Sequence, residues 1–150
     1  VQLSPDNGYS GWDRISGYFY PDTIIGSFSH THFSGTGIGD LYDIAFMPAV
    51  PPLKYGSQID KDELGVYSSF SHEKEWAEPG YYTVYLEDYN VRAEMTASKR
   101  VGFHRYTFPE TKQALIFLNL ARSMNWDNTT DTQLEIVGEK RVQGYRFSRR

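Results

Sequence analysis

Apolar and polar residues alternate along much of the chain. Between Val91 and Ala97 the odd positions are apolar and the even positions are polar, a period of two that is typical of a β-strand with one face in water. The segment 114–120 is apolar at nearly every position, so we predict a central strand there, although a short buried helix has the same pattern. Further strands are predicted at residues 24–28, 41–47, 81–88, 100–108, 132–137 and 142–147.

Turn-forming residues separate these segments. They are Pro5 to Gly8, Pro79-Gly80, residues 88–90, Pro109-Glu110 and the polar stretch 127–131. Prolines from Pro48 to Pro52 are expected to end the strand before them, and residues 54–63 to form an exposed connection. Strands that recur about every ten residues, without the apolar spacing of an ordinary helix, predict an all-β fold, a β-sandwich of mainly antiparallel strands.

Composition narrows the class of protein. The chain has 150 residues, enough for one domain with a real core. Its 15 basic and 19 acidic residues give a net charge of −4 without long runs of one sign, so no nucleic-acid partner is expected. Cysteine is absent, which excludes disulfides and thiolate chemistry. No apolar run reaches the length of a membrane span, so none is expected.

Both ends of the chain look internal to a longer sequence. The first residues already belong to an alternating segment, and the last ten alternate arginines with Tyr145 and Phe147 as a strand would. Natural domains usually end in polar, poorly ordered tails. We therefore expect residues 1–150 to be one β-sandwich domain, truncated at both ends and excerpted from a larger protein.

The densest polar chemistry lies in residues 28–43, between two predicted strands. This stretch has two histidines, four serine and threonine hydroxyls, three glycines and two aspartates, whereas a plain turn needs only one or two such residues. His30 and His32 would share one face of an extended segment, and with Asp40 or Asp43 they could bind a metal such as zinc. The alternatives are hydrogen bonding to a polar ligand, which we favour, and a purely structural network.

Other polar and aromatic residues are weaker candidates. Trp12 could stack on a sugar or a base, or be a half-buried core residue. Asp13 and Asp40 could form a carboxylate pair, but their spacing does not select them, so no catalytic residue is predicted. A second polar group, which we interpret as a solvated turn, consists of His72, Glu73 and Glu75.

A series of motifs runs along the chain from Ser4 to Pro109. They are Ser4-Pro-Asp-Asn-Gly8, Gly11-Trp-Asp-Arg-Ile-Ser-Gly-Tyr18, Phe28-Ser-His-Thr-His-Phe-Ser-Gly-Thr-Gly37, Gly39-Asp-Leu-Tyr-Asp-Ile44, Phe70-Ser-His-Glu73, Pro79-Gly-Tyr-Tyr-Thr-Val84, Glu94-Met-Thr-Ala97 and Arg100-Val-Gly-Phe-His-Arg-Tyr-Thr-Phe-Pro109. Together, and in this order, they resemble the N-terminal domain of glycoside hydrolase family 92.

The resemblance implies an exo-acting, calcium-dependent α-mannosidase that inverts configuration, from a family known mainly in bacteria. Such enzymes place a supersandwich-like β-sandwich before a larger (α/α) barrel, and the active site lies between the two domains. Both catalytic carboxylates and most calcium ligands belong to the barrel, so this chain alone is expected to be inactive. The expected substrate is a mannose-containing glycan with α-1,2 linkages, such as an N-glycan. The expected location is the periplasm, the cell surface or the medium of a bacterium.

The same resemblance implies that two motifs of this chain line the pocket for the terminal mannose, where the chain meets the helical catalytic domain. The substrate-binding residues implied are Trp12, Asp13, Arg14, His30, His32, Gly35 and Thr36. The alternative function is a free-standing β-sandwich carbohydrate-binding module that uses Trp12 and nearby tyrosines as a platform.

Overall fold

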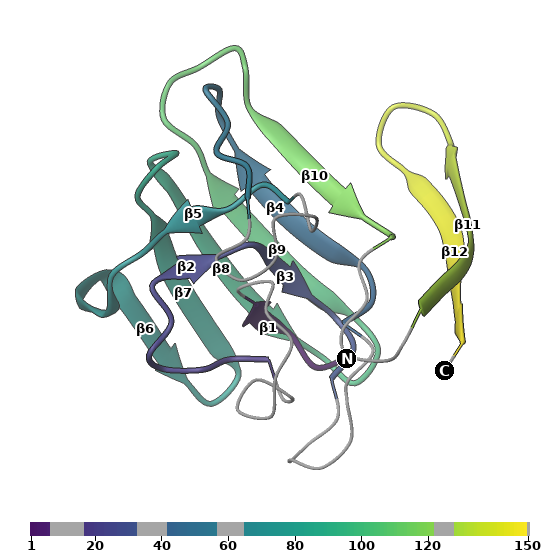
Figure 1. Ribbon diagram of the computed structural model, residues 1–150, viewed down its shortest axis with the longest axis horizontal. Coiled ribbons are helices and arrows are strands. Elements are labelled where there is room, and N and C mark those ends of the chain that lie inside the picture. Colours follow the sequence, from purple (N-terminus) through teal and green to yellow (C-terminus); the bar gives the residue numbers. More distant parts are fainter. Residues whose placement is uncertain (7–16, 33–41, 57–64, 122–127, 150) are drawn as a thin grey trace.

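The chain folds as an all-β structure (Figure 1). The computed structural model describes residues 1–6, 17–32, 42–56, 65–121 and 128–149. Within these ranges η2 (His72–Lys74) is a single 3-10 turn and no α-helix occurs, which confirms the predicted fold class. The strands are β1 (Ser4–Asp6), β2 (Ile24–Ile25), β3 (Ser27–Ser29), β4 (Ala45–Ala49), β5 (Ser68–Ser69), β6 (Glu75–Glu78), β7 (Tyr81–Leu86), β8 (Val91–Ala97), β9 (Gly102–Thr107), β10 (Leu115–Asn119), β11 (Asn128–Ile136) and β12 (Val142–Arg149). Among the described elements no helix is long and apolar enough to cross a membrane.

Two four-stranded antiparallel sheets pack face to face. One has the strand order β1-β3-β4-β10 and the other β6-β7-β8-β9, and Figure 1 shows the first sheet in front of the second. The buried side chains between them belong to one apolar cluster, with Phe28, Met47 and Ala49 from the first sheet and Val84, Leu86, Val91, Ala93 and Met95 from the second. Burial of each large side chain is worth roughly 1.5–3 kcal/mol, so this cluster holds the sheets together.

Strand β8 shows how the alternating pattern becomes a half-buried strand. Val91 and Met95 are at most 3% exposed, whereas Arg92 and Thr96 on the opposite face are exposed. The predicted boundaries, Val91 to Ala97, are those of the structure. The turns on either side of β7 also lie where they were predicted, and positive φ angles occur in both, 85° at Gly80 and 53° at Asn90.

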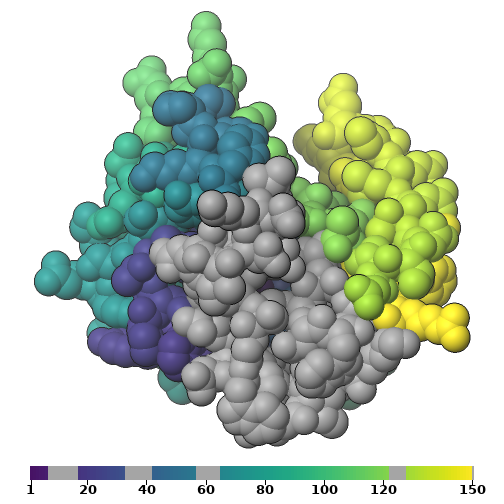
Figure 2. Space-filling view, viewed as in Figure 1, coloured from purple at the N-terminus to yellow at the C-terminus, as the bar shows by residue number. Residues whose placement is uncertain are grey.

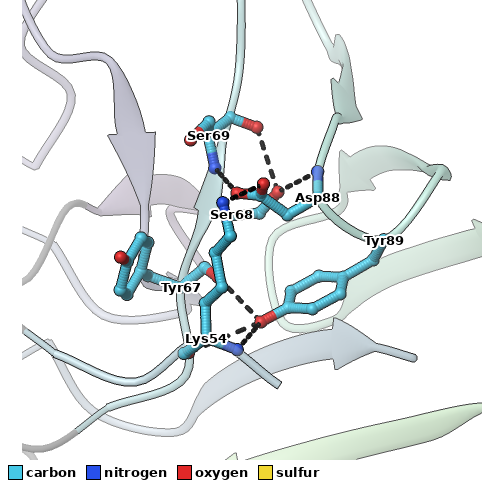
Figure 3. Close-up of polar contacts among 6 residues, drawn as sticks. All are labelled: Lys54, Tyr67, Ser68, Ser69, Asp88 and Tyr89. Carbon is cyan, nitrogen blue, oxygen red and sulfur yellow. Dashed lines mark hydrogen bonds and ion pairs between the residues drawn. The ribbon is translucent and has the colours of Figure 1, made fainter. Parts of the chain in front are cut away.

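Side chains anchor the turn between β7 and β8 (Figure 3). The buried Tyr89 hydroxyl donates to the Tyr67 carbonyl at 2.8 Å and accepts from the Lys54 N–H at 3.0 Å. The Asp88 carboxylate accepts from the Ser69 N–H at 2.7 Å and pairs with the Lys54 ammonium. Lys54 begins the segment that we expected to be an exposed connection; it is exposed, as expected, and it is also fixed to this turn. Residues 57–64 of that segment lie outside the described residues.

The strand predicted at residues 24–28 is two strands with different partners. In β2, Ile24 pairs with Ser69 of β5. In β3, Phe28 pairs with both Pro5 of β1 and Phe46 of β4. The prediction of one strand was wrong because a run of apolar residues does not show that the chain crosses from one sheet to another.

Two prolines lie inside strands where we predicted a turn or a strand end. Pro5 belongs to β1, an edge strand, where its missing N–H leaves no ladder incomplete. Pro48 belongs to β4 and lies opposite Ile116 of β10. The position facing Pro48 on the other side would be Gly26, before β3 begins, because Phe28 is opposite Phe46. Pro5 therefore lies at the edge of the sheet, and Pro48 has a ladder partner only in β10.

The C-terminal third also differs from the prediction. Strand β10 lies at the end of its sheet rather than in the centre, and the side chain of Ile116 is 56% exposed. Asn128 to Asp131, predicted as part of a turn, belong to β11, which pairs with β12 as a separate hairpin. Figures 1 and 2 show this hairpin standing apart from the two packed sheets.

Candidate functional site

Hydrogen bonds join the two ends of the 28–43 stretch. The His30 N–H donates to the Asp43 carbonyl at 3.1 Å, and the Tyr42 N–H donates to the Thr31 carbonyl at 3.2 Å. The Asp43 N–H also donates to the Thr31 hydroxyl at 2.8 Å. The stretch is therefore closed at a narrow base, and we call residues 30–32 and 42–44 the loop base.

Two residues of the returning arm have left-handed backbone conformations. The φ angles are 54° at Tyr42 and 55° at Ile44, and for a β-branched residue such a φ costs roughly 1–3 kcal/mol. Burial of Tyr42, which is 1% exposed, and a 2.7 Å hydrogen bond from His30 Nδ1–H to the Ile44 carbonyl hold this arm in place. Strain of this kind occurs mostly at functional sites, so it supports the loop base as the candidate site.

His32 is held by a buried polar network. Its Nε2 lies 2.5 Å from the Ser29 hydroxyl and 3.6 Å from Asp6 Oδ1, and the His32 and Asp6 side chains are 4% and 1% exposed. The Ser29 hydroxyl has one proton, which it donates to the Asp6 carboxylate, so it accepts from His32 Nε2–H. The edge of the imidazole contacts the Tyr42 ring at 4.6 Å between centroids. His32 therefore ties the loop base to β1 and β3.

Gly17 brings the motif that contains Trp12 against the motif that contains His32. Gly17 has a φ of 95°, and a Cβ placed on it would lie 2.2 Å from the Ser4 hydroxyl oxygen and 2.9 Å from His32 Cε1. Only glycine fits such a close approach. Since Gly17 follows Arg14 by three positions, the end of the Trp12-containing motif lies beside the loop base.

His30 forms a second network with strand β9. Its Nε2 lies 3.0 Å from His104 Nε2, and His104 Nδ1 lies 2.8 Å from the Tyr106 hydroxyl. Because His30 Nδ1–H donates to the Ile44 carbonyl, His30 Nε2 is the acceptor of this pair. His104 then carries its proton on Nε2 and accepts from the Tyr106 hydroxyl. These tautomers follow from the hydrogen-bond network.

Burial keeps this histidine pair uncharged. It lowers the pKa of His30, and it lowers the pKa of His104 to about 4, with the neighbouring His30 adding to that effect. Burial also raises the pKa of the Tyr106 hydroxyl, which therefore stays a donor. Phe46 packs against both imidazoles, with ring centroids 5.2 and 5.7 Å away. The pair can donate and accept hydrogen bonds, but it carries no charge near neutral pH.

An ion pair joins the loop base to the C-terminal hairpin. The Arg146 guanidinium of β12 pairs with the Asp43 carboxylate, and the Arg146 side chain is only 3% exposed. Arg146 Nε also donates to the Leu120 carbonyl and to the Thr129 hydroxyl, both at 3.0 Å. Asp43 is thus neutralised by an arginine from a distant strand.

The metal hypothesis for the two histidines finds no support in this arrangement. His30 faces His104, whereas His32 faces Ser29 and Asp6, so the two imidazoles do not converge on one position. Asp43, one of the two possible third ligands, is paired with Arg146. In the part of the chain that the structure describes, no three histidine, aspartate or glutamate side chains come together as metal ligands.

The remaining predicted site residues lie outside the described residues. They are Trp12, Asp13, Arg14, Gly35, Thr36 and Asp40. Conversely, sequence reasoning missed the partners of the two histidines. His104 and Tyr106 belong to the motif at residues 100–109, but no role was assigned to them. Arg146, the partner of Asp43, was visible only as one arginine in a basic segment.

The second polar group forms a turn without buried residues, as predicted, but the Glu75 side chain beside it is packed rather than solvated. His72 Nδ1 and the hydroxyls of Tyr18 and Tyr82 all contact the Glu75 carboxylate, whose side chain is 8% exposed. The Tyr20 ring stacks on His72 at 4.1 Å between centroids. Glu73, the third residue predicted in this group, is exposed. The cluster fixes residues 18–20 to the sheet that contains β6 and β7.

Comparisons with known proteins agree with the motifs. The model of the glycosyl hydrolase family 92 N-terminal domain matches residues 1–150. Two solved structures of the family GH92 α-mannosidase BT3965 from Bacteroides thetaiotaomicron, one of them in complex with mannoimidazole, are 40% identical to this chain with a TM-score of 0.88. They cover 98% of this chain, which spans 19–20% of theirs. No curated protein matches.

Proposed function

Because the chain belongs to glycosyl hydrolase family 92 and matches the N-terminal domain of that family, we propose that it forms the substrate-side wall of an exo-α-mannosidase active site. The proposed reaction removes a terminal mannose from a glycan with inversion, and α-1,2-linked mannosides are the proposed substrates. The observation that carries the proposal is the loop base. It closes the polar stretch at residues 28–43, which contains motifs of this family, and His30 and His32 fix it to other strands.

The described side chains suit binding rather than proton transfer. The Asp6 carboxylate accepts from Ser29, and the Asp43 carboxylate is paired with Arg146, so neither is poised as an acid or a base. An inverting reaction needs an acid and a base on opposite sides of the sugar, with a water between them. We propose that a helical catalytic domain outside these 150 residues supplies both.

The pocket wall is proposed to combine the two motifs that Gly17 brings together. Trp12 would pack against a sugar face, and Asp13 and Arg14 would form paired hydrogen bonds with neighbouring hydroxyls. The backbone at Gly35 and Thr36 would approach the sugar from the histidine loop. The position of Gly17 against His32 supports this assembly, because only two residues lie between Arg14 and Gly17.

Calcium and cellular location belong to the proposal as well. The described residues do not fit a complete calcium site, since no three histidine or carboxylate side chains meet among them. We propose that most calcium ligands come from the helical domain and that the enzyme acts in the periplasm, at the surface or in the medium of a bacterium. The chain spans 19–20% of the length of its solved relatives, which favours a part of a larger enzyme over a free-standing sugar-binding module.

The test compares the full-length protein with the 150-residue chain on an α-1,2-linked mannobiose. We expect mannose release with an initially β-configured product from the full-length protein, and no release from the isolated chain. In the full-length protein, His30→Ala should lower kcat/KM by roughly ten- to a hundredfold, because an unpaired polar group costs about 1–3 kcal/mol. Mannose release by the isolated chain, or an α-configured product, would contradict the proposal.

A further inference from the structure

The β11–β12 hairpin makes few contacts with the sandwich among the described residues. Leu134, Ile136 and Val142 are 51%, 76% and 53% exposed. Figure 1 shows the hairpin beside the two sheets rather than within either of them. Arg146 differs from these neighbours, because its side chain is 3% exposed and points into the body of the protein.

Arg146 connects three segments. Its Nε donates to the Leu120 carbonyl, at the start of the connection that leaves β10, and to the Thr129 hydroxyl at the start of β11. Its Nη1 pairs with Asp43 of the loop base. A guanidinium presents five N–H donors in a rigid planar fork, which neither lysine nor an amide does. Removing one partner of such an ion pair strongly destabilises the fold, because the other charge is left uncompensated.

Asp43 links Arg146 to the candidate site. Its carbonyl accepts from the His30 N–H, and its own N–H donates to the Thr31 hydroxyl. A shift of Asp43 therefore disturbs both hydrogen bonds that close the loop base on this side. Burial does not fix Asp43 independently, since 20% of its side chain is exposed.

We propose that Arg146 is a positioning residue for substrate binding, acting through Asp43 on the loop base and thereby coupling the β11–β12 hairpin to the sugar-binding wall. This inference rests on the proposed function for its effect on mannosides, but the coupling itself concerns only residues of this chain. The described contacts of Arg146 are with Asp43, Leu120 and Thr129, and none of these three is among the residues proposed to bind the sugar. A displacement of the hairpin should displace His30.

The experiment uses the full-length protein with four single variants and the double variant of Arg146→Met and Asp43→Asn. Arg146→Met removes the charge and the donors at similar length, Arg146→Lys keeps the charge, and Asp43→Asn keeps the shape of the acceptor. Arg141→Met is the matched control, because Arg141 belongs to the same hairpin and is exposed, with its guanidinium donating to Gln143 at 2.9 Å. The readouts are hydrogen–deuterium exchange of peptides that cover residues 29–32 and 42–46, and kcat and KM on the mannobiose.

We expect Arg146→Met to speed exchange at the loop base and to raise KM by about tenfold, with a smaller change in kcat, since a misplaced binding loop weakens substrate positioning. Arg146→Lys should recover part of the loss. Asp43→Asn should have a similar effect, and the double variant should be no worse than either single one, because both remove one interaction. Exchange within β7 and β8 should not change, which separates this effect from general unfolding.

Equal exchange at the loop base in Arg146→Met and Arg141→Met would overturn the inference. So would additive effects of the Arg146→Met and Asp43→Asn substitutions on that exchange. If the wild-type protein releases no mannose, the proposed function fails, and the exchange measurements still decide whether Arg146 positions the loop base.

Discussion

His72 Nδ1 lies 2.5 Å from a carboxylate oxygen of Glu75. The other ring nitrogen of His72, Nε2, lies 2.7 Å from the Tyr20 carbonyl oxygen. Both partners are acceptors, so both ring nitrogens must donate, and only the protonated imidazolium can do so. The hydrogen bond to Glu75, together with the one to the Tyr20 carbonyl, accordingly raises the pKa of His72 above its ordinary 6.5.

A pH-dependent stability follows from this pair. Because the folded pKa of His72 is raised, its stabilising contribution is complete below pH 6.5 and is lost as the pH rises through the folded value. We expect His72→Gln to lower the thermal midpoint most at pH 5.5 to 6 and least at pH 9. Glu73→Gln, at an exposed neighbouring residue, is the control. An equal effect of His72→Gln across this range would show that His72 is not charged in the folded protein.

The histidine pair at the loop base should show the opposite behaviour. The pKa of His104 is about 4, so the neutral form stabilises the fold above pH 6.5, and this contribution is lost as the pH falls toward 4. Nitrogen NMR of histidine-labelled protein should show His30 protonated on Nδ1 and His104 on Nε2 at pH 7. An imidazolium signal from either residue at that pH would disprove the proposed hydrogen-bond chain.

His32 should matter for stability more than His30. Replacing His32 by alanine removes the donor to the Ser29 hydroxyl, which still donates to Asp6, and leaving a buried acceptor unsatisfied costs about 1–3 kcal/mol. We therefore expect His32→Ala to lower the free energy of unfolding by about this amount, measured by chemical denaturation. His30→Ala should cost less, since its hydrogen bond to the Ile44 carbonyl is exposed to water and the one to His104 is only partly buried. The reverse order would show that the Asp6 network does not hold the loop base.

The isolated 150-residue chain should self-associate through its hairpin. Ile136 and Val142 are directly opposed on β11 and β12, and Leu134 follows on the same face, so an exposed apolar surface runs along the hairpin. Sedimentation velocity should show association that grows with concentration. The double variant Ile136→Lys and Val142→Lys should abolish it, because charges on an exposed strand prevent pairing with another chain. Unchanged association in that variant would place the contact elsewhere.

Removal of calcium should inactivate the full-length enzyme. This prediction rests on family membership, and chelation with EGTA should abolish mannose release, with recovery when calcium is added back. The thermal transition of the isolated chain should be insensitive to the chelator, because the described residues bring no three metal ligands together. A chelator-dependent shift of that transition would mean that the chain binds calcium itself.

Local patterns determined the elements of this fold. The period of two placed β8 at its observed boundaries, and Pro79-Gly80 marked a turn, because alternation and turn chemistry depend on residues next to each other in sequence. The ordered motifs identified the family over the whole chain. What these patterns could not show is which strands pair, so the run at residues 24–28 was assigned to one strand and β10 to the centre of a sheet.

Only the tertiary structure decided what the candidate residues contact. The partner of His30 is His104, 74 positions away, and the partner of Asp43 is Arg146 of the last strand. Alternation predicts that a side chain points inward, but the group that it meets depends on strand pairing and on how the sheets pack. The sequence thus marked the polar loop as a candidate site, and the packing of distant strands decided that His30 is neutral and that His30 and His32 have separate partners at the loop base.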